Sequence, residues 1–304
     1  MKRVPICENF SKDDYNNGNL HEYDPYLTIP NIIDIDWYNG LTPYCKKLLD
    51  GLDYLLGTVT VPHKVEETNP FLSTVHQAYL DSFDYHVWCD KKKDVSLLKI
   101  TPDIKTVLLD MYSKRVKTTE GLIDFKNEIG KVISGYHGGW FMRLSSTSGK
   151  NEDALEPLYT AEDVIKRLAS IKLFVEKEYR RDKNTYLVLI PWKMDIELDP
   201  QYEFRVFVVN GKLCAACPQR WFDQYQYSEQ ELDRIEKALL NINFNQYQTY
   251  IADVYITDHC ELIEFNPFGA HSGAGSQLFN WITDYDLLHG KGTPELRYRS
   301  AIGY

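Results

Sequence analysis

A hairpin near the end of the chain brings two acidic residues face to face. If residues 257–260 form a four-residue loop, the register of the flanking strands places Asp253 opposite Glu264, and Asn266 follows on the same face. Two carboxylates paired across strands repel each other unless a cation or a proton lies with them. Carboxylate and amide oxygens are typical ligands of a hard divalent cation. Asp253, Glu264 and Asn266 are therefore candidate ligands of such a cation.

Two interpretations of this acidic pair remain open. The acids could face solvent on an exposed sheet, as most charged residues do, or they could bind a cation. The sequence Asn266-Pro267-Phe268-Gly269 ends the second strand abruptly, as the rim of a functional site would. This ending favours the cation.

A second hairpin presents Arg205. The dipeptide Asn210-Gly211 favours a two-residue turn that pairs Val209 with Lys212. Carried along the strands, this register places Arg205 in the centre of one face, across from Ala216, while the other face is apolar and must be core. The guanidinium could therefore meet an anionic ligand. An ion pair with a nearby carboxylate is the alternative, and the hairpin alone favours it.

A third segment, Phe141–Lys150, leads from a predicted strand into a small, hydroxyl-rich loop. Arg143 lies near the end of the strand, and the loop contains Ser145, Ser146, Gly149 and Lys150. Backbone N–H groups and two cations in such a loop could bind phosphate groups. Serine-rich linkers look similar, and the spacing differs from that of a P-loop, so this segment does not identify a phosphate site by itself.

The elements that must position these residues lie mainly after residue 118. Capped helices are expected to begin at Thr160 and Ser228, and a further helix at Pro102–Arg115. Residues 1 to about 110 indicate few other elements. Strands are expected at Gly139–Leu144, Tyr186–Trp192, Glu203–Val209, Lys212–Cys217, Tyr250–Ile256 and Glu261–Asn266.

Composition limits the classes of protein. The 304 residues, 43% of them hydrophobic, can bury one large core or two modest ones. A net charge of −10 counts against a general nucleic-acid-binding surface. The six cysteines lack a disulfide framework spacing, and Cys214-x-x-Cys217 lacks a second ligand pair for zinc. Since the apolar runs are too short for a membrane helix and no secretory signal is apparent, we expect a cytoplasmic protein.

Read in order, several segments resemble the cell division cycle protein 123 family. The resemblance covers about residues 110–285, and the N-terminal third matches only vaguely. The segments that carry it are Phe141–Lys150, Leu187–Trp192, Glu203–Val208, Asp253–Tyr255, Leu262–Gly269 and the tail Ser276–Trp281.

The resemblance implies an α+β ATP-grasp fold, in which two α+β subdomains with antiparallel sheets hold ATP between them. Residues 1–110 would then be a divergent N-terminal region that packs on or completes the first subdomain, and residues 111–304 the nucleotide-binding core. The resemblance also implies that Asp253, Glu264 and Asn266 coordinate Mg²⁺ and that Arg205 contacts the phosphates of ATP.

The family resemblance further implies the remaining nucleotide contacts. A hinge formed by Leu189, Ile190, Pro191 and Trp192 would line the adenine, and the loop 145–150 would cover the triphosphate. Arg143 stands where the family usually has lysine, and Ile190-Pro191 where it has Arg-Lys. Arg143 and Arg205 are the residues that would neutralise charge during phosphoryl transfer.

Two functions follow from the resemblance and remain open. Eukaryotic members of the family are ATP-dependent assembly chaperones that join subunits of translation initiation factor 2, so such a subunit or another protein client is an expected partner. The alternative is an ATP-dependent ligase, of the carboxylate–amine type or joining nucleic-acid ends, although the net charge counts against nucleic acid. We expect no membrane partner. The composition and the reworked N-terminal third suggest a divergent member and allow a viral one.

Overall fold

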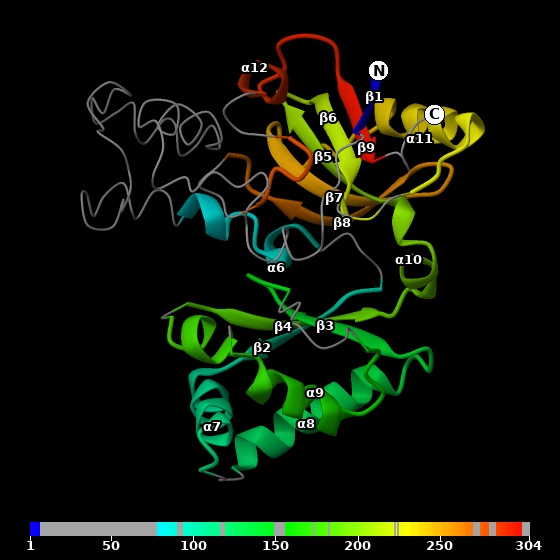
Figure 1. Ribbon diagram of the computed structural model, residues 1–304. Coiled ribbons are helices and arrows are strands. Elements are labelled where there is room, and N and C mark those ends of the chain that lie inside the picture. Colours follow the sequence, from blue (N-terminus) through cyan, green and yellow to red (C-terminus); the bar gives the residue numbers. More distant parts are fainter. Residues whose placement is uncertain are drawn as a thin grey trace, which may run out of the picture. The chain divides into compact units, whose positions relative to one another are not determined.

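The computed structural model divides into two compact units (Figure 1), unit 1 with Met1–Ser82 and Asp195–Tyr304 and unit 2 with Phe83–Met194. The boundary expected near residue 110 falls inside a helix of unit 2. The structure describes residues 1–6, 78–89, 94–115, 119–148, 156–172, 174–181, 183–221, 223, 225–269, 274–279 and 284–299.

Unit 1 is built on a mixed six-stranded sheet with the order β1-β9-β6-β5-β7-β8. Strand β9 runs parallel to both β1 and β6, and the other neighbouring pairs are antiparallel. The expectation of antiparallel sheets therefore holds only in part here. The strands are β1 Lys2–Ile6, β5 Glu203–Val209, β6 Lys212–Pro218, β7 Tyr250–Ile256, β8 Cys260–Asn266 and β9 Glu295–Arg299.

Both faces of this sheet are buried at its centre. One face carries Phe207 and Ile251, which pack against Phe268, Leu278 and Phe279. The opposite face carries further buried strand residues such as Phe204 and Val254. Helical segments described in this unit are α10 Met194–Leu198, a 3-10 turn Pro200–Tyr202, α11 Glu229–Leu240 and α12 Tyr285–Leu288.

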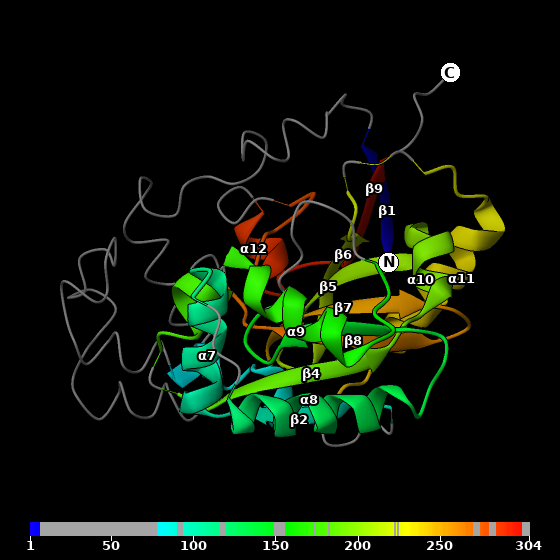
Figure 2. The ribbon, with the colours of Figure 1, turned by 90° about the horizontal axis from the view of Figure 1, so that it is seen from below.

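Unit 2 contains an antiparallel three-stranded sheet with the order β2-β4-β3, covered on one face by helices (Figures 1 and 2). The strands are β2 Ser96–Ile100, β3 Trp140–Leu144 and β4 Thr185–Pro191. The helices on this face are α7 Pro102–Tyr112, α8 Glu120–Ile133 and α9 Ala161–Ser170. The unit also contains α6 Tyr85–Trp88 and a π-helical turn Phe174–Glu178.

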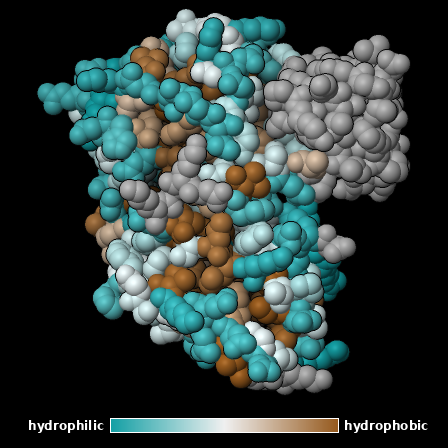
Figure 3. All heavy atoms as spheres, turned by 180° about the vertical axis from the view of Figure 1, so that it is seen from behind, coloured by the Kyte–Doolittle hydropathy of each residue, from teal (hydrophilic) through white to brown (hydrophobic). Residues whose placement is uncertain are grey.

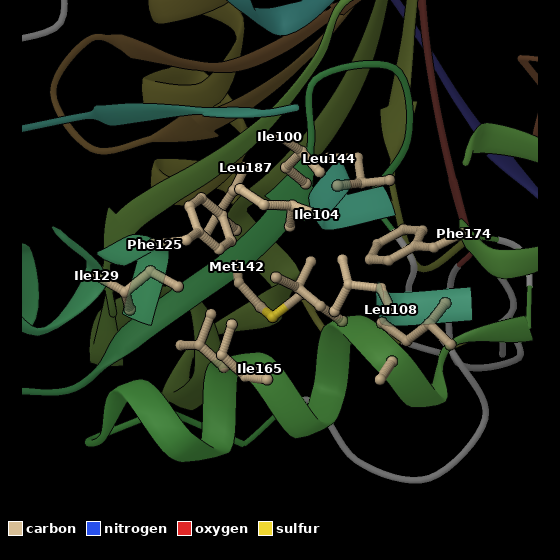
Figure 4. Packing of buried hydrophobic residues seen from close by; sticks show 14 of the residues in the cluster. Ile100, Ile104, Leu108, Phe125, Ile129, Met142, Leu144, Ile165, Phe174 and Leu187 are labelled. Carbon is tan, nitrogen blue, oxygen red and sulfur yellow. The ribbon is translucent and has the colours of Figure 1, made fainter. Parts of the chain in front are cut away.

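The core of unit 2 lies where the helices meet the sheet. Figure 4 shows Met142 and Leu187 from the sheet packed among Leu108, Phe125 and Ile165 from three helices. Each of α7, α8 and α9 begins at a threonine whose hydroxyl accepts a backbone N–H of the first turn, namely Thr101, Thr119 and Thr160.

The outer surface of the molecule mixes hydrophilic and apolar side chains on the face seen in Figure 3. No helix in the described ranges is long and apolar enough to cross a membrane. Large apolar side chains that remain exposed include those of Val87, Tyr112, Ile123, Tyr136, Tyr159, Met194, Leu198 and Leu240.

Most expected strands agree with the structure to within one residue at each end. Strands β5 and β7 have the expected limits, and Ser228 caps α11. The helix expected at Pro102–Arg115 ends earlier, at Tyr112, and Lys114 takes a positive φ of 58°. Helix α8 and strands β1, β2 and β9 were not expected. Of these, β1 and β9 are short and stable only through pairing with other strands.

The register predicted for the first hairpin is wrong beyond its turn. Asn210-Gly211 has positive φ at both residues and pairs Val209 with Lys212, as expected. A β-bulge then shifts the pairing between Phe207 and Val208, so that Arg205 lies opposite Cys217 and not opposite Ala216. One extra residue on β6 causes the shift, because a bulge moves every later pair by one position.

In the second hairpin, two departures from the predicted register compensate each other. The loop has three residues, since Ile256 pairs with Cys260 and not with Glu261. A bulge between Asp253 and Val254 then restores the alignment, and Asp253 does lie opposite Glu264. The pairing that suggested a cation site is therefore confirmed, although the predicted loop length was wrong.

Candidate functional site

Three charged side chains form a row across neighbouring strands of unit 1. Arg205 on β5 pairs in register with Asp253 on β7, and Asp253 pairs with Glu264 on β8. Since residues paired in register point to the same face, the three side chains lie together. All three are buried, and Asp253 has no exposed surface.

Arg205 and Asp253 form a bidentate ion pair. Nε of Arg205 donates to Oδ1 of Asp253 at 2.9 Å, and Nη2 donates to Oδ2 at 3.0 Å. Burial by itself lowers the pKa of Arg205, but the charge and hydrogen bonds of Asp253, with a contribution from Glu264, raise this pKa above its ordinary value. The structural ion pair that the sequence favoured for Arg205 is thus present.

Two side-chain amides complete the surroundings of Asp253. Gln219 donates to Oδ2 at 3.0 Å, and Asn266 donates to the same oxygen at 3.4 Å. With the two bonds from Arg205 included, Asp253 accepts four hydrogen bonds, three of them at Oδ2. Asp253 is therefore a well-compensated buried anion.

The tail segment 274–279 holds this network from the other side. Nη1 of Arg205 donates to the carbonyl of Gly275 at 2.9 Å, and Gln277 donates to Oε1 of Gln219 at 2.9 Å. The bond from Gln277 directs the NH₂ end of Gln219 towards Asp253. Arg297 anchors the segment by donating to the carbonyl of Leu278 at 3.1 Å.

The side chains of Asp253, Glu264 and Asn266 fit Mg²⁺ if the contact between Asn266 and Asp253 rearranges. Glu264 and Asn266 lie on the same face as Asp253 and provide the hard oxygen atoms that Mg²⁺ prefers. A cation at Oδ2 of Asp253 would have to replace one of the three donors there, and the contact from Asn266 is the longest. Turning the Asn266 amide over would present its oxygen in place of its NH₂ group, and the two ends of an amide are assigned from such contacts.

Other metal chemistry finds little support in the described part of the chain. No group of three or more histidine, cysteine, aspartate or glutamate side chains there is arranged to hold a metal ion. Burial raises the pKa of the Cys214 thiol to about 11 and that of Cys217 to about 12, so neither thiol ionises readily.

The phosphate-loop candidates lie in unit 2. Arg143 is buried on β3, where its Nε donates to the carbonyl of Leu144 at 3.2 Å and its guanidinium lies 5.0 Å from the centre of the Tyr85 ring. Arg143 pairs in register with Val188 on β4. Gly149 and Lys150, the other half of the expected loop, lie outside the described residues.

The hydroxyl groups of both candidate serines make protein contacts. Oγ of Ser145 lies 2.6 Å from Nδ1 of His86 and accepts the backbone N–H of His86 at 2.8 Å. The hydroxyl of Ser146 donates to Glu178, which also accepts from Arg181 at 3.3 Å. A phosphate ligand would therefore have to compete with Glu178 for the Ser146 hydroxyl.

The expected hinge runs through the end of β4. The side chain of Leu189 is fully buried in the core of unit 2, so only its backbone could meet a ligand. Ile190 and Pro191 are half-buried and pair with Phe141 and Trp140 on β3. Trp192 is half-buried, and its backbone N–H donates to the carbonyl of Gly139, just before β3, at 2.9 Å.

Sequence reasoning missed two glutamines and a histidine beside these candidates. Gln219 follows a strand end without any motif, and nothing in the sequence connects His86 with Ser145. Gln277 belongs to the tail Ser276–Trp281, which resembles the family, so the resemblance could have pointed to this residue.

Comparison with solved structures gives the class of the fold. The chain is similar to the structure of Cdc123 from Schizosaccharomyces pombe, with a TM-score of 0.55 and 21% identity, covering 72% of this chain and 96% of that one. The C-terminally truncated form of that protein matches with a TM-score of 0.56. The protein is therefore a mixed α+β protein with the fold of Cdc123.

Sequence comparison then gives the family that this chain is similar to. Residues 158–300 match the D123 family model. A CDC123-like protein of Acanthamoeba polyphaga mimivirus is 25% identical over 265 residues, which span 75% of this chain and 78% of that relative.

Two cellular relatives match over a shorter region. The translation initiation factor eIF2 assembly protein of Danio rerio is 36% identical over 116 residues, and cell division cycle protein 123 of Eremothecium gossypii is 32% identical over 121. Each match covers 36% of this chain but only 31% and 32% of the respective relative, so it spans about a third of their length.

Proposed function

We propose that this protein is an Mg-ATP-binding assembly factor with an ATP-grasp fold, acting on a subunit of translation initiation factor 2. The observation that carries the proposal is the buried row of Arg205, Asp253 and Glu264, with Asn266 on the same face. The Danio rerio relative is an eIF2 assembly protein, and this supports the choice of client.

In the proposed site, Asp253, Glu264 and Asn266 would hold Mg²⁺ once the Asn266 amide turns its oxygen towards the ion. The bound ion would neutralise charge on the phosphates of ATP and orient them. Arg205 holds Asp253 ionised and in place, because its two N–H groups bind both carboxylate oxygens.

We also propose nucleotide contacts for residues within unit 2. Arg143 and the hydroxyl of Ser146 are candidates for phosphate, with Ser145, Gly149 and Lys150 in the same loop. The backbone of Leu189 and the residues Ile190, Pro191 and Trp192 are candidates for the adenine.

The metal site is tested by calorimetric titration with Mg-ATP. We expect Glu264→Gln to weaken binding at least about tenfold, since loss of a ligand or of its partner typically costs 10- to 100-fold in metal affinity. Asp253→Asn should weaken binding as well but also removes a buried ion pair, so Glu264→Gln is the decisive variant. Asp258→Asn, in the exposed loop of the same hairpin, is the matched control. Unchanged affinity in Glu264→Gln would refute the site.

The client is tested by pull-down of initiation factor 2 subunits with and without Mg-ATP. We expect retention of a subunit that depends on the nucleotide and is lost in Glu264→Gln. ATP turnover that requires an added amine, hydroxyl or nucleic-acid end, with no subunit retained, would instead identify the ligase.

A further inference from the structure

The phenol of Tyr79 makes two hydrogen bonds with a single residue of the site rim. Its hydroxyl donates to the carbonyl of Phe268 at 2.9 Å and accepts the N–H of Phe268 at 2.7 Å. Both groups are buried, and Tyr79 has 1% of its surface exposed. One side chain thus binds both the donor and the acceptor of one backbone residue.

Phe268 lies two residues after Asn266, in a stretch with little freedom of its own. Pro267 has a fixed φ, and Gly269 has a φ of 110°, a conformation that strongly favours glycine. Phe268 is itself packed in the core of unit 1. The bonds to Tyr79 therefore fix where the chain leaves β8 immediately after Asn266.

A second tyrosine holds the helical turn that carries Tyr79. The hydroxyl of Tyr247 donates to the carbonyl of Ser82 at 2.6 Å, and Ser82 in turn donates to the carbonyl of Tyr79 at 2.6 Å. The ring of Tyr247 packs edge-on against Phe265 at 5.0 Å. Two phenols therefore hold this helical turn. They differ in that the Tyr79 hydroxyl both donates to and accepts from Phe268, two residues after Asn266, whereas the Tyr247 hydroxyl donates to Ser82.

We propose that Tyr79 is a positioning residue for the Asn266 ligand. This inference rests on the proposed magnesium site and extends it to a part of the chain that lies outside the D123 match at residues 158–300. By fixing Phe268, Tyr79 limits the positions that the Asn266 amide can take when it turns towards a cation. Partners that orient a metal ligand commonly affect metal affinity as much as the ligands themselves.

The test compares Tyr79→Phe with Tyr247→Phe, because each removes one phenol oxygen that holds the same turn. Binding of Mn²⁺, used alone as the probe for the cation site, is followed by electron paramagnetic resonance, and thermal unfolding by circular dichroism. We expect both variants to lose some stability. We expect Mn²⁺ affinity to fall about tenfold in Tyr79→Phe and to stay within twofold of wild type in Tyr247→Phe.

The outcomes separate the inference from the function on which it rests. Mn²⁺ affinity unchanged in Tyr79→Phe, or reduced equally in both variants, would overturn the positioning role and leave the cation site intact. A wild-type protein that binds no Mn²⁺ would overturn the site itself and the inference with it. If Tyr79→Phe does not fold, hydrogen exchange of residues 266–269 in the wild type decides, since saturation with Mn²⁺ should slow it and unchanged exchange would contradict the role.

Discussion

At the scale of single residues, Arg205 and Asp253 show how one contact can serve stability and a binding site together. The pair is buried, bidentate and supported by Gln219 and the carbonyl of Gly275. Removing one partner of such a pair leaves an uncompensated buried charge, which is far more costly than loss of a surface ion pair.

We therefore expect Arg205→Ala to lower the free energy of unfolding by about 3–5 kcal/mol. Lys212→Ala, an exposed change in the same hairpin, should alter it by less than about 0.5 kcal/mol. Urea denaturation measures both values. Because Arg205 holds Asp253, Mg-ATP affinity should also fall more in Arg205→Ala than in Lys212→Ala, and equal losses would contradict this assignment.

At the scale of elements, helix α11 begins with a complete capping box. The Ser228 hydroxyl accepts the N–H of Glu231 at 3.2 Å, and the Glu231 carboxylate accepts the N–H of Ser228 at 2.8 Å. The hydroxyl of Tyr202 also donates to Glu231. The hydrogen bond from the Ser228 side chain, followed by that from Tyr202, lowers the pKa of Glu231 from 4.5 to about 2.

This shift predicts a pH-dependent contribution to stability. Since the pKa of Glu231 is lower in the folded state, its stabilisation is complete above about pH 4.5 and is lost as the pH falls towards 2. Glutamine can still accept the N–H of Ser228, so Glu231→Gln removes mainly the charge at the start of the helix, and we expect it to cost about 0.3–1 kcal/mol at pH 7. The difference in melting temperature from wild type should shrink between pH 5 and pH 3, and a difference independent of pH would contradict the prediction.

Two glycines of unit 2 give opposite expectations for the same substitution. Gly139 precedes β3 with a φ of 86°, and an added Cβ would lie 2.6 Å from Cβ of Pro157, so Gly139→Ala should destabilise the protein. Gly130 lies inside α8 with no atom within 4 Å of an added Cβ, so Gly130→Ala should stabilise it by about 0.5–1 kcal/mol. The melting temperature should fall in Gly139→Ala and rise in Gly130→Ala, and thermal unfolding of the two variants measures both changes.

At the scale of the whole molecule, the two units differ in how the chain forms them. Unit 2 is one continuous stretch with its own hydrophobic core, whereas unit 1 combines two separate stretches of chain. The parallel pairing of β1 with β9 joins the two stretches within unit 1. Folding of unit 1 therefore requires contacts that are distant along the chain.

The fragment 83–194 should accordingly fold by itself. We expect it to show helical circular dichroism and cooperative thermal unfolding, because its core cluster lies wholly within these residues. A fragment that lacks a cooperative transition would show that unit 2 depends on the rest of the chain.

The candidate cation site was predictable because it depends on a hairpin whose strands carry clear alternation. Asp253, Glu264 and Asn266 share a face in the structure as predicted. The loop is one residue shorter than predicted, and a bulge offsets this difference and restores the predicted pairing. Bulges have weak sequence signals, which is why the partner of Arg205 was misassigned. Gln219 and Tyr79 could not be predicted, since their partners are far away in the sequence.

The sequence by itself determined the local features: the helix caps, the Asn210-Gly211 turn, the main strands and the acidic pair. Each of these depends on neighbouring residues or on a repeating pattern. Only the tertiary structure decided which groups satisfy the buried charge of Asp253. Its carboxylate needs several donors at once, and Arg205, Gln219 and the segment 274–279 come from separate parts of the chain. The same holds for Tyr79, which meets Phe268 across 189 residues of sequence.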